Sequence, residues 1–144
     1  MALHPIGSIR QAAMTQEHPN ITLLKRLDRS NLAASKELFA EDVVFHFFNP
    51  NLPELQGDHV GPDGIRALFD ALAEKSHGTF RIEPVSIAAV GDELVVVQSR
   101  NTLAIAGRAV TMDVVVVWRI VNGRIVEVWD IVPGQPSEVQ DAKV

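Results

Sequence analysis

The chain has 144 residues, enough for one domain with its own hydrophobic core, and it contains neither cysteine nor tyrosine. The two absences exclude disulfides, thiolate metal ligands, a cysteine nucleophile and any mechanism that needs a phenol as donor. The net charge of −5 and the lack of clustered cations argue against nucleic acid as a partner.

The hydrophobic content of 47% and the mean hydropathy of +0.11 are typical of a globular protein. The longest unbroken apolar run, residues 114–118, is far shorter than the roughly 20 residues of a membrane-spanning helix, so no membrane is expected as a partner. Residues 1–19 lack the basic start and apolar stretch of a secretory signal, and we expect them to form a loose arm. The default expectation is a cytoplasmic protein.

The pattern that follows the arm predicts two short helices. Asn20 is a suitable N-cap, and leucines then recur at helical spacing up to Leu27. A break at residues 28–31 separates this helix from a second one over residues 32–39. The two helices are expected to form a helical hairpin.

A strand and a third helix come next. Residues 43–48 are β-branched and aromatic and predict a short strand, which is followed by a polar loop over residues 49–61. Pro62 then stands at a helix start, where its missing N–H costs nothing. Apolar residues at positions i, i+3, i+4 and i+7 from Ile65 make this helix amphipathic, and Gly78 ends it.

The remainder of the domain is predicted to be sheet. The expected strands cover residues 79–90, 93–106, 109–121 and 124–132. Pro84 indicates an edge strand or a bulge, and Asn122–Gly123 is the strongest hairpin signal in the chain. The domain is thus expected over residues 20–134, with a loose polar tail over residues 135–144.

This order of elements predicts an α+β fold, with three N-terminal helices packed on one face of a strongly bent, mostly antiparallel sheet. A bent sheet covered by only three helices leaves a cone-shaped cavity. The cavity is where we look for a site.

Three motifs resemble those of a known group. They are LFAEDVVFH at residues 38–46, GPDGIR at residues 61–66 and VWRIVNGRIVEVWD at residues 117–130. In combination they resemble the SnoaL-like, polyketide-cyclase and ketosteroid-isomerase-like members of the nuclear transport factor 2-like superfamily. The resemblance covers residues 24–133 and implies a cone-shaped α+β barrel. The chemistry of that superfamily is diverse, so the fold alone does not assign a function.

Asp130 is the first candidate for a catalytic residue. It interrupts an apolar strand near the end of the sheet, where an outward-facing carboxylate is also common. In the families that the chain resembles, an acidic residue at this place often points into the cone. Burial in an apolar cone disfavours the charged carboxylate, which is the setting that a general base near neutral pH needs.

The turn at residues 122–123 decides which residues share the face of Asp130. A two-residue type I′ turn places Asp130 opposite Val115, whereas a type I turn with a glycine bulge places it opposite Val116. The resemblance to limonene-epoxide-hydrolase-like and cyclase members favours the bulged register. The pocket wall would then consist of Met112, Val114, Val116 and Trp118, which would also serve as core.

Gln98 and Arg100 are polar interruptions in the preceding strand, and two orientations remain open. With a bulged turn at Gly107, both face the pocket, and Arg100 can pair with Asp130 and orient it. With a plain two-residue turn, Arg100 faces Asp113 on the outer surface, where an ion pair contributes little. The similar epoxide hydrolases carry an Arg and an Asp at the equivalent positions, so this pair argues against epoxide hydrolysis.

His46 and Asn49 are candidates from the first strand. A histidine among phenylalanines is often a structural residue, but the resembled signature has a histidine here that commonly faces the cavity. Asn49 stands where similar hydrolases carry a pocket asparagine. Strict alternation places the two on opposite faces, so both point inward only if the chain bends before Pro50. His59 is expected to be a solvated loop residue, and no two histidines have metal-ligand spacing, so we expect neither metal nor cofactor.

Two functions follow from this pattern. The first is a small cofactor-free enzyme, in which Asp130 abstracts a proton next to a carbonyl or activates water, while His46, Asn49 or Arg100 stabilises the enolate. Its substrate would be a small, mainly apolar carbonyl compound, undergoing isomerase, cyclase or dehydratase chemistry. The lack of tyrosine disfavours the mechanism of ketosteroid isomerase itself.

The second function is non-catalytic: a domain that binds a small molecule or associates with itself. Residues 114–117 are apolar on both faces of their strand, so the outer face of the sheet also needs cover. A homodimer through that face would supply it, as in many members of the resembled superfamily.

Overall fold

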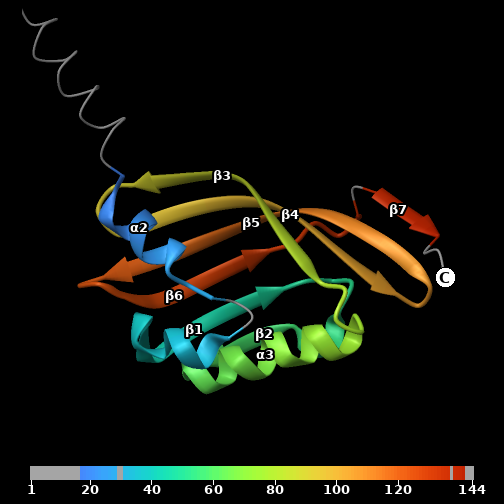
Figure 1. The fold of residues 1–144 in the computed structure, drawn as a ribbon, viewed down its shortest axis with the longest axis horizontal. Coiled ribbons are helices and arrows are strands. Elements are labelled where there is room, and N and C mark those ends of the chain that lie inside the picture. Colours follow the sequence, from blue (N-terminus) through green and yellow to red (C-terminus); the bar gives the residue numbers. More distant parts are fainter. Residues whose placement is uncertain (1–16, 29–30, 137, 142–144) are drawn as a thin grey trace, which may run out of the picture.

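The computed structural model describes residues 17–28, 31–136 and 138–141. The predicted N-terminal arm lies outside the described residues up to residue 16. The elements follow the order α2 (Pro19–Lys25), η1 (Leu32–Leu38), β1 (Phe39–Phe48), η2 (Pro53–Leu55), β2 (Gly57–Val60), α3 (Gly61–Lys75), β3 (Arg81–Val90), β4 (Leu94–Ile105), β5 (Arg108–Val121), β6 (Arg124–Ile131) and β7 (Glu138–Asp141) (Figure 1).

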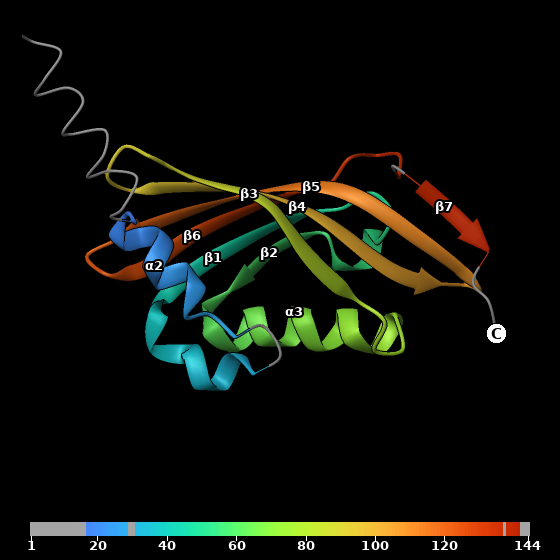
Figure 2. The same cartoon turned by 45° about the horizontal axis from the view of Figure 1, so that its top comes forward.

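The strands form one curved, mixed sheet in the order β2-β1-β6-β5-β4-β3, and β7 pairs with the far end of β5. Strands β1 and β6 are parallel, whereas the other pairs are antiparallel. The helices α3 and η1 lie beneath the sheet in Figure 2, on its concave side. The predicted α+β class and the mostly antiparallel sheet are therefore confirmed.

The two N-terminal helices differ from their prediction in two details. The first helix begins earlier, because the His18 ring accepts a hydrogen bond from the Asn20 amide and Pro19 occupies the first turn. The second helix is a 3-10 helix. Its buried residues, Leu32, Ser35 and Leu38, are three apart and therefore share one face at three residues per turn.

The core lies between α3 and the concave face of the sheet. Ile65, Leu68 and Leu72 of α3 are at most 4% exposed, and they face strand residues such as Phe45 and Trp118 in one cluster. Burying each such side chain contributes roughly 1.5–3 kcal/mol to folding. The amphipathic spacing in α3 thus fixes the face that closes the concave side.

Two strands were not predicted. Strand β2 lies in the segment predicted to be a loop and pairs with β1 at the edge of the sheet. Strand β7 lies in the segment predicted to be a loose tail. Both are four residues long and largely polar, so neither has the alternation that identifies a half-buried strand.

Pro84 behaves as its position predicts. Strand β3 is the edge strand beside β4, and its register shifts between Pro84 and Ser86.

No helix within the described residues is both long and apolar enough to cross a membrane.

Candidate functional site

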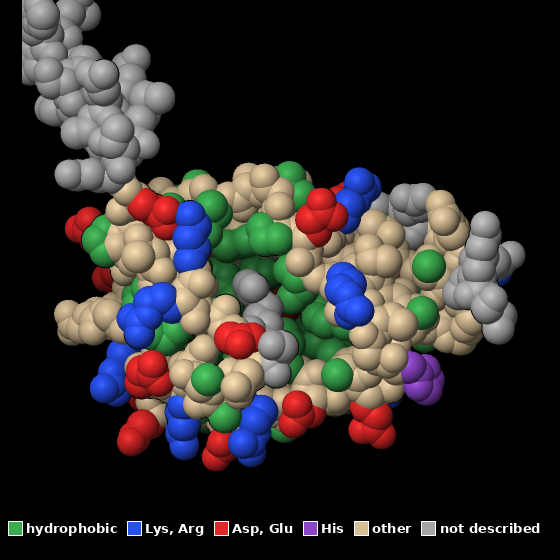
Figure 3. All heavy atoms as spheres, in the orientation of Figure 1, with side chains coloured by type: hydrophobic (Ala, Val, Ile, Leu, Met, Phe, Trp, Pro, Cys, Tyr) green, Lys and Arg blue, Asp and Glu red, His purple; other side chains and the backbone are tan. Residues whose placement is uncertain are grey.

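A pocket of about 730 Å³, its open mouth included, lies between the concave face of the sheet and α3. Figure 3 shows hydrophobic side chains in a hollow between β3 and α3. Fifteen of its nineteen lining residues are apolar. The four polar lining residues are Asn49, Ser99, Asn101 and Asp130.

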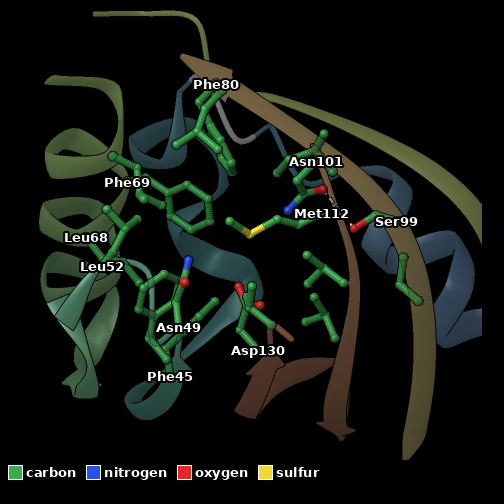
Figure 4. A pocket seen from close by; sticks show the side chains of 18 of the residues that line it. Phe45, Asn49, Leu52, Leu68, Phe69, Phe80, Ser99, Asn101, Met112 and Asp130 are labelled. Carbon is green, nitrogen blue, oxygen red and sulfur yellow. Dashed lines mark hydrogen bonds between the residues drawn. The ribbon is translucent and has the colours of Figure 1, made fainter. Parts of the chain in front are cut away.

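Asp130 of β6 lines this pocket, opposite Val116 of β5 and Phe47 of β1. Figure 4 shows its carboxylate among apolar side chains, close to Asn49. The predicted wall residues also line the pocket: Met112, Val114, Val116 and Trp118. This end of the site therefore has the predicted composition.

A bulge inside β6 produces this arrangement. The Asn122–Gly123 turn is a two-residue turn with both φ angles positive, 52° and 75°, which is the type I′ geometry. Ile120 pairs with Ile125, but Arg119 pairs with Glu127, so Val126 is an extra residue. The register is the predicted bulged one, yet the bulge lies within the strand and not in the turn.

Arg100 and Gln98 face the other way. The turn at Ala106–Gly107 has two residues, and β4 pairs with β5 without a register shift. Arg100 is consequently opposite Asp113 on the outer face, with 3.6 Å between Arg100 Nε and Asp113 Oδ1 and both side chains about half exposed. The pocket orientation considered for Arg100 and Gln98 is not the one adopted, because no bulge changes the face at this turn.

His46 also lies on the outer face and not in the pocket. Its Nδ1 is 2.7 Å from Asp58 Oδ1 and its Nε2 is 2.6 Å from Glu127 Oε2, while its ring stacks on Trp129 with the centroids 5.6 Å apart. Partial burial opposes a charge on the ring, but the hydrogen bonds to Glu127 and Asp58 outweigh it, and the pKa of His46 is raised above its ordinary value. The inward orientation considered for His46 is therefore wrong. Side chains alternate along a strand, and Phe45 and Phe47 take the inward positions on either side of His46.

Asn49 is buried and lines the pocket where β1 ends. Its Oδ1 accepts the backbone N–H of Asn51 at 3.0 Å, and its carbonyl accepts the N–H of Leu52. This turn occupies the amide oxygen and leaves Nδ2 as the group available to a ligand. His46 and Asn49 thus lie on opposite faces, as alternation requires.

Two polar residues of the pocket were missed. Ser99 and Asn101 of β4 both line it, and Ser99 Oγ donates a hydrogen bond to Asn101 Oδ1 at 2.9 Å. The signal was present in the sequence, because both residues continue the alternation of Val95 and Val97.

The remaining titratable candidate, His59, is a strand residue. Its Nε2 lies 2.8 Å from the Leu55 carbonyl oxygen, and its ring packs edge-on against Phe47. Across the described ranges, no group of three His, Asp or Glu side chains is arranged to hold a metal ion.

Comparisons with known proteins agree with this architecture. A solved NTF2-like protein of unknown function from Burkholderia pseudomallei is 24% identical with a TM-score of 0.68, covering 80% of this chain and 91% of that one. TerC, co-crystallised with polyporic acid, is 20% identical with a TM-score of 0.67, covering 80% and 92%. A putative polyketide cyclase from Sinorhizobium meliloti is 20% identical with a TM-score of 0.55, covering 71% and 83%.

These likenesses show a shared fold. The comparison with curated proteins gave no match. A family model described as the SnoaL-like domain matches residues 22–128, which is most of the chain. On this match, the chain belongs to the SnoaL-like domain family.

Proposed function

We propose that the pocket takes up a small, mainly apolar carbonyl compound and that Asp130 acts in it as a general base without a cofactor. The observation that carries the proposal is the position of Asp130: among the described lining residues it is the one carboxylate, surrounded by an apolar wall. Such surroundings favour proton abstraction, because a carboxylate that gains little from solvent is a stronger base than one in water.

Asn49 is the partner that this chemistry needs. Asp130 takes a proton from the carbon next to the ligand carbonyl, and the electron pair of the C–H bond moves onto the carbonyl oxygen as an enolate. Asn49 Nδ2, whose amide oxygen is held by Asn51, can donate to that oxygen. Asn49 takes this role alone, because Arg100 and His46 lie on the outer face.

The reaction that follows depends on where the proton returns. Return to a different carbon is an isomerisation, attack of the enolate on a second carbonyl is a cyclisation, and loss of a β-hydroxyl is a dehydration. The likeness in fold to a putative polyketide cyclase and to TerC, co-crystallised with polyporic acid, supports carbonyl chemistry of this kind.

The first step can be measured without knowing the product. Purified protein is incubated in D₂O with a panel of enolisable ketones, and deuterium incorporation next to the carbonyl is followed by NMR. Asp130→Asn should lower the exchange rate by roughly 100- to 10,000-fold. Asp113→Asn is the matched control, since Asp113 lies on the outer face of the same sheet. An Asp130→Asn rate equal to the wild-type rate would remove Asp130 as the base.

A second role, self-association, is favoured by the outer face of the sheet. Phe48, Ile131 and Val115 form a continuous row across β1, β6 and β5, with exposed fractions of 55%, 50% and 38%. A row of exposed apolar side chains on a sheet face is unfavourable in water, and a second copy of the chain can bury it because it carries the same row. Sedimentation should give a dimer at micromolar concentration, and a monomer there would contradict this role.

A further inference from the structure

The pocket has a second polar end. Ser99 and Asn101 lie on β4 opposite Val114 and Met112, whereas Asp130 lies on β6 opposite Val116. Figure 4 shows Asn49 and Asp130 at one end and Ser99 and Asn101 at the other, with the Met112 side chain extending between them. The lining residues around Ser99 and Asn101 are otherwise apolar, so this pair is the polar feature there.

The hydrogen bond between the two side chains fixes how the amide is oriented. Ser99 is 2% exposed, and its hydroxyl proton needs an acceptor because an unpaired buried donor is costly. Asn101 Oδ1, at 2.9 Å, is that acceptor. The opposite amide orientation would place an N–H donor beside the hydroxyl and leave its proton without an acceptor. Asn101 Nδ2 is therefore the end that remains for the pocket.

The amide nitrogen of Asn101, Nδ2, still needs a hydrogen-bond acceptor. Asn101 is half-buried, and within the described ranges its Nδ2 donates no hydrogen bond. Only acceptors can satisfy it, and no charged side chain lines this end of the pocket. A neutral oxygen of a ligand fits both conditions, whereas a carboxylate or phosphate would lack a compensating charge.

The register gives the spacing between the two ends. Met112 and Val116 are four residues apart on β5, which corresponds to about 13 Å along the strand. The wall between the two ends is apolar, with Val114 at its centre. The matching ligand is elongated, with a carbonyl at one end, an apolar middle and a second neutral oxygen at the other end.

We infer that Asn101, oriented by Ser99, is a specificity-determining residue that donates a hydrogen bond to this second oxygen. The inference rests on the proposed function for the identity of the first end, since Asp130 and Asn49 receive the enolisable carbonyl. It adds the chemical class of the ligand: an elongated apolar ketone with a distal carbonyl, ether or hydroxyl oxygen.

The test uses two matched ligands. The first is a biphenyl methyl ketone with a methoxy group on the far ring, and the second carries an ethyl group in its place, so that one oxygen becomes a methylene. Binding to the full chain is measured by titration calorimetry. The wild type should bind the methoxy ketone roughly three- to tenfold more tightly, the difference expected for one net hydrogen bond.

Three variants locate the source of this preference. Asn101→Leu removes the donor, and Asn101→Asp keeps an acceptor for Ser99 but also lacks the donor, so both should lower the preference to about one. Ser99→Ala releases the amide and should weaken the preference. Gln98→Leu is the matched control, because Gln98 lies on the outer face of the same strand, and it should keep the preference. Thermal melts followed by circular dichroism establish that each variant is folded.

The inference is overturned if the wild type shows no preference for the methoxy ketone, absence of binding by both ligands included, or if Asn101→Leu retains the preference. The Asp130→Asn variant separates this result from the proposed function. If it keeps both the preference and the wild-type deuterium exchange, the general base is wrong while the ligand selection by Asn101 stands. If Asp130→Asn lowers the exchange rate but none of the Asn101 and Ser99 variants alters the preference, the general base stands and the ligand selection by Asn101 is wrong.

Discussion

The histidine that joins two carboxylates on the outer face gives the most detailed prediction. His46 of β1 links Asp58 of β2 to Glu127 of β6, so it connects an edge strand to the centre of the sheet. His46→Gln keeps a polar side chain but removes the positive charge and the aromatic ring. The change should destabilise the protein more at pH 6 than at pH 9.

The magnitude follows from exposure. The Asp58 side chain is 61% exposed, so its ion pair contributes only about 0–1 kcal/mol. The Glu127 and His46 side chains are about one-third exposed, and screening reduces this charged hydrogen bond to about 1 kcal/mol. Stacking of the ring on Trp129 adds about 0.5–1 kcal/mol at any pH. His46→Gln should therefore cost about 2 kcal/mol at pH 6.

The sign of the pH dependence is set by the raised pKa of His46. Desolvation opposes protonation, but Glu127 and Asp58 raise the folded-state pKa above the unfolded value of about 6.5. The protonated folded form is thus favoured, and its contribution is complete below the unfolded pKa. It is lost as the pH rises through the folded pKa, which leaves mainly the stacking contribution at pH 9.

Urea unfolding of the wild type and of His46→Gln at both pH values measures the effect. The variant should cost about 1 kcal/mol less at pH 9 than at pH 6. An NMR titration of the His46 ring supplies an independent check, since Glu127→Gln should lower its pKa. Equal costs of His46→Gln at the two pH values, or a titration unmoved by Glu127→Gln, would refute the argument.

Three further changes test the core, a turn and the outer face. Leu68→Ala should cost about 2–5 kcal/mol in urea unfolding, because Leu68 of α3 is 1% exposed and packs in the core between α3 and the sheet; a cost below 1 kcal/mol would contradict its place in the core. Gly123→Ala should lower the melting temperature through a loss of about 1–2 kcal/mol, because Gly123 has a φ of 75° that a Cβ disfavours; an unchanged melt would count against the type I′ turn. Ile131→Glu should convert the proposed dimer to a monomer in sedimentation, whereas Val139→Glu, an exposed valine on β7, should not; a dimer that survives Ile131→Glu would exclude the row across β1, β6 and β5 as its interface.

The elements that bury a face were the predictable part of the fold. The spacing of Ile65, Leu68 and Leu72 identified α3, and alternation identified the long strands, because burial repeats with the period of the backbone. Strand β2 buries little side-chain surface and carries no such repeat. The spacing of Leu32, Ser35 and Leu38 fits both an α-helix and a 3-10 helix, so the sequence could not separate the two.

The candidate site depended on register, which sequence determines less directly. The resemblance predicts that Asp130 faces the pocket. The inward orientation itself results from the bulge at Val126, which has no local signal in the sequence. Alternation alone would have placed His46 outside and Ser99 and Asn101 inside. The resembled motif drew attention to His46, whereas the plain period of the strand was the better guide there.

The bulge at Val126 also affects how sequences of this kind should be compared. One residue added or removed between the hairpin and Asp130 reverses the parity of the strand, and a carboxylate at the same alignment column would then face outward. An alignment that matches the Asn–Gly turn and the acidic residue separately can therefore equate chains with opposite geometry. The useful marker is the number of residues between Gly123 and Asp130 taken together with the bulge at Val126, because the two together determine which side of the sheet holds the acid.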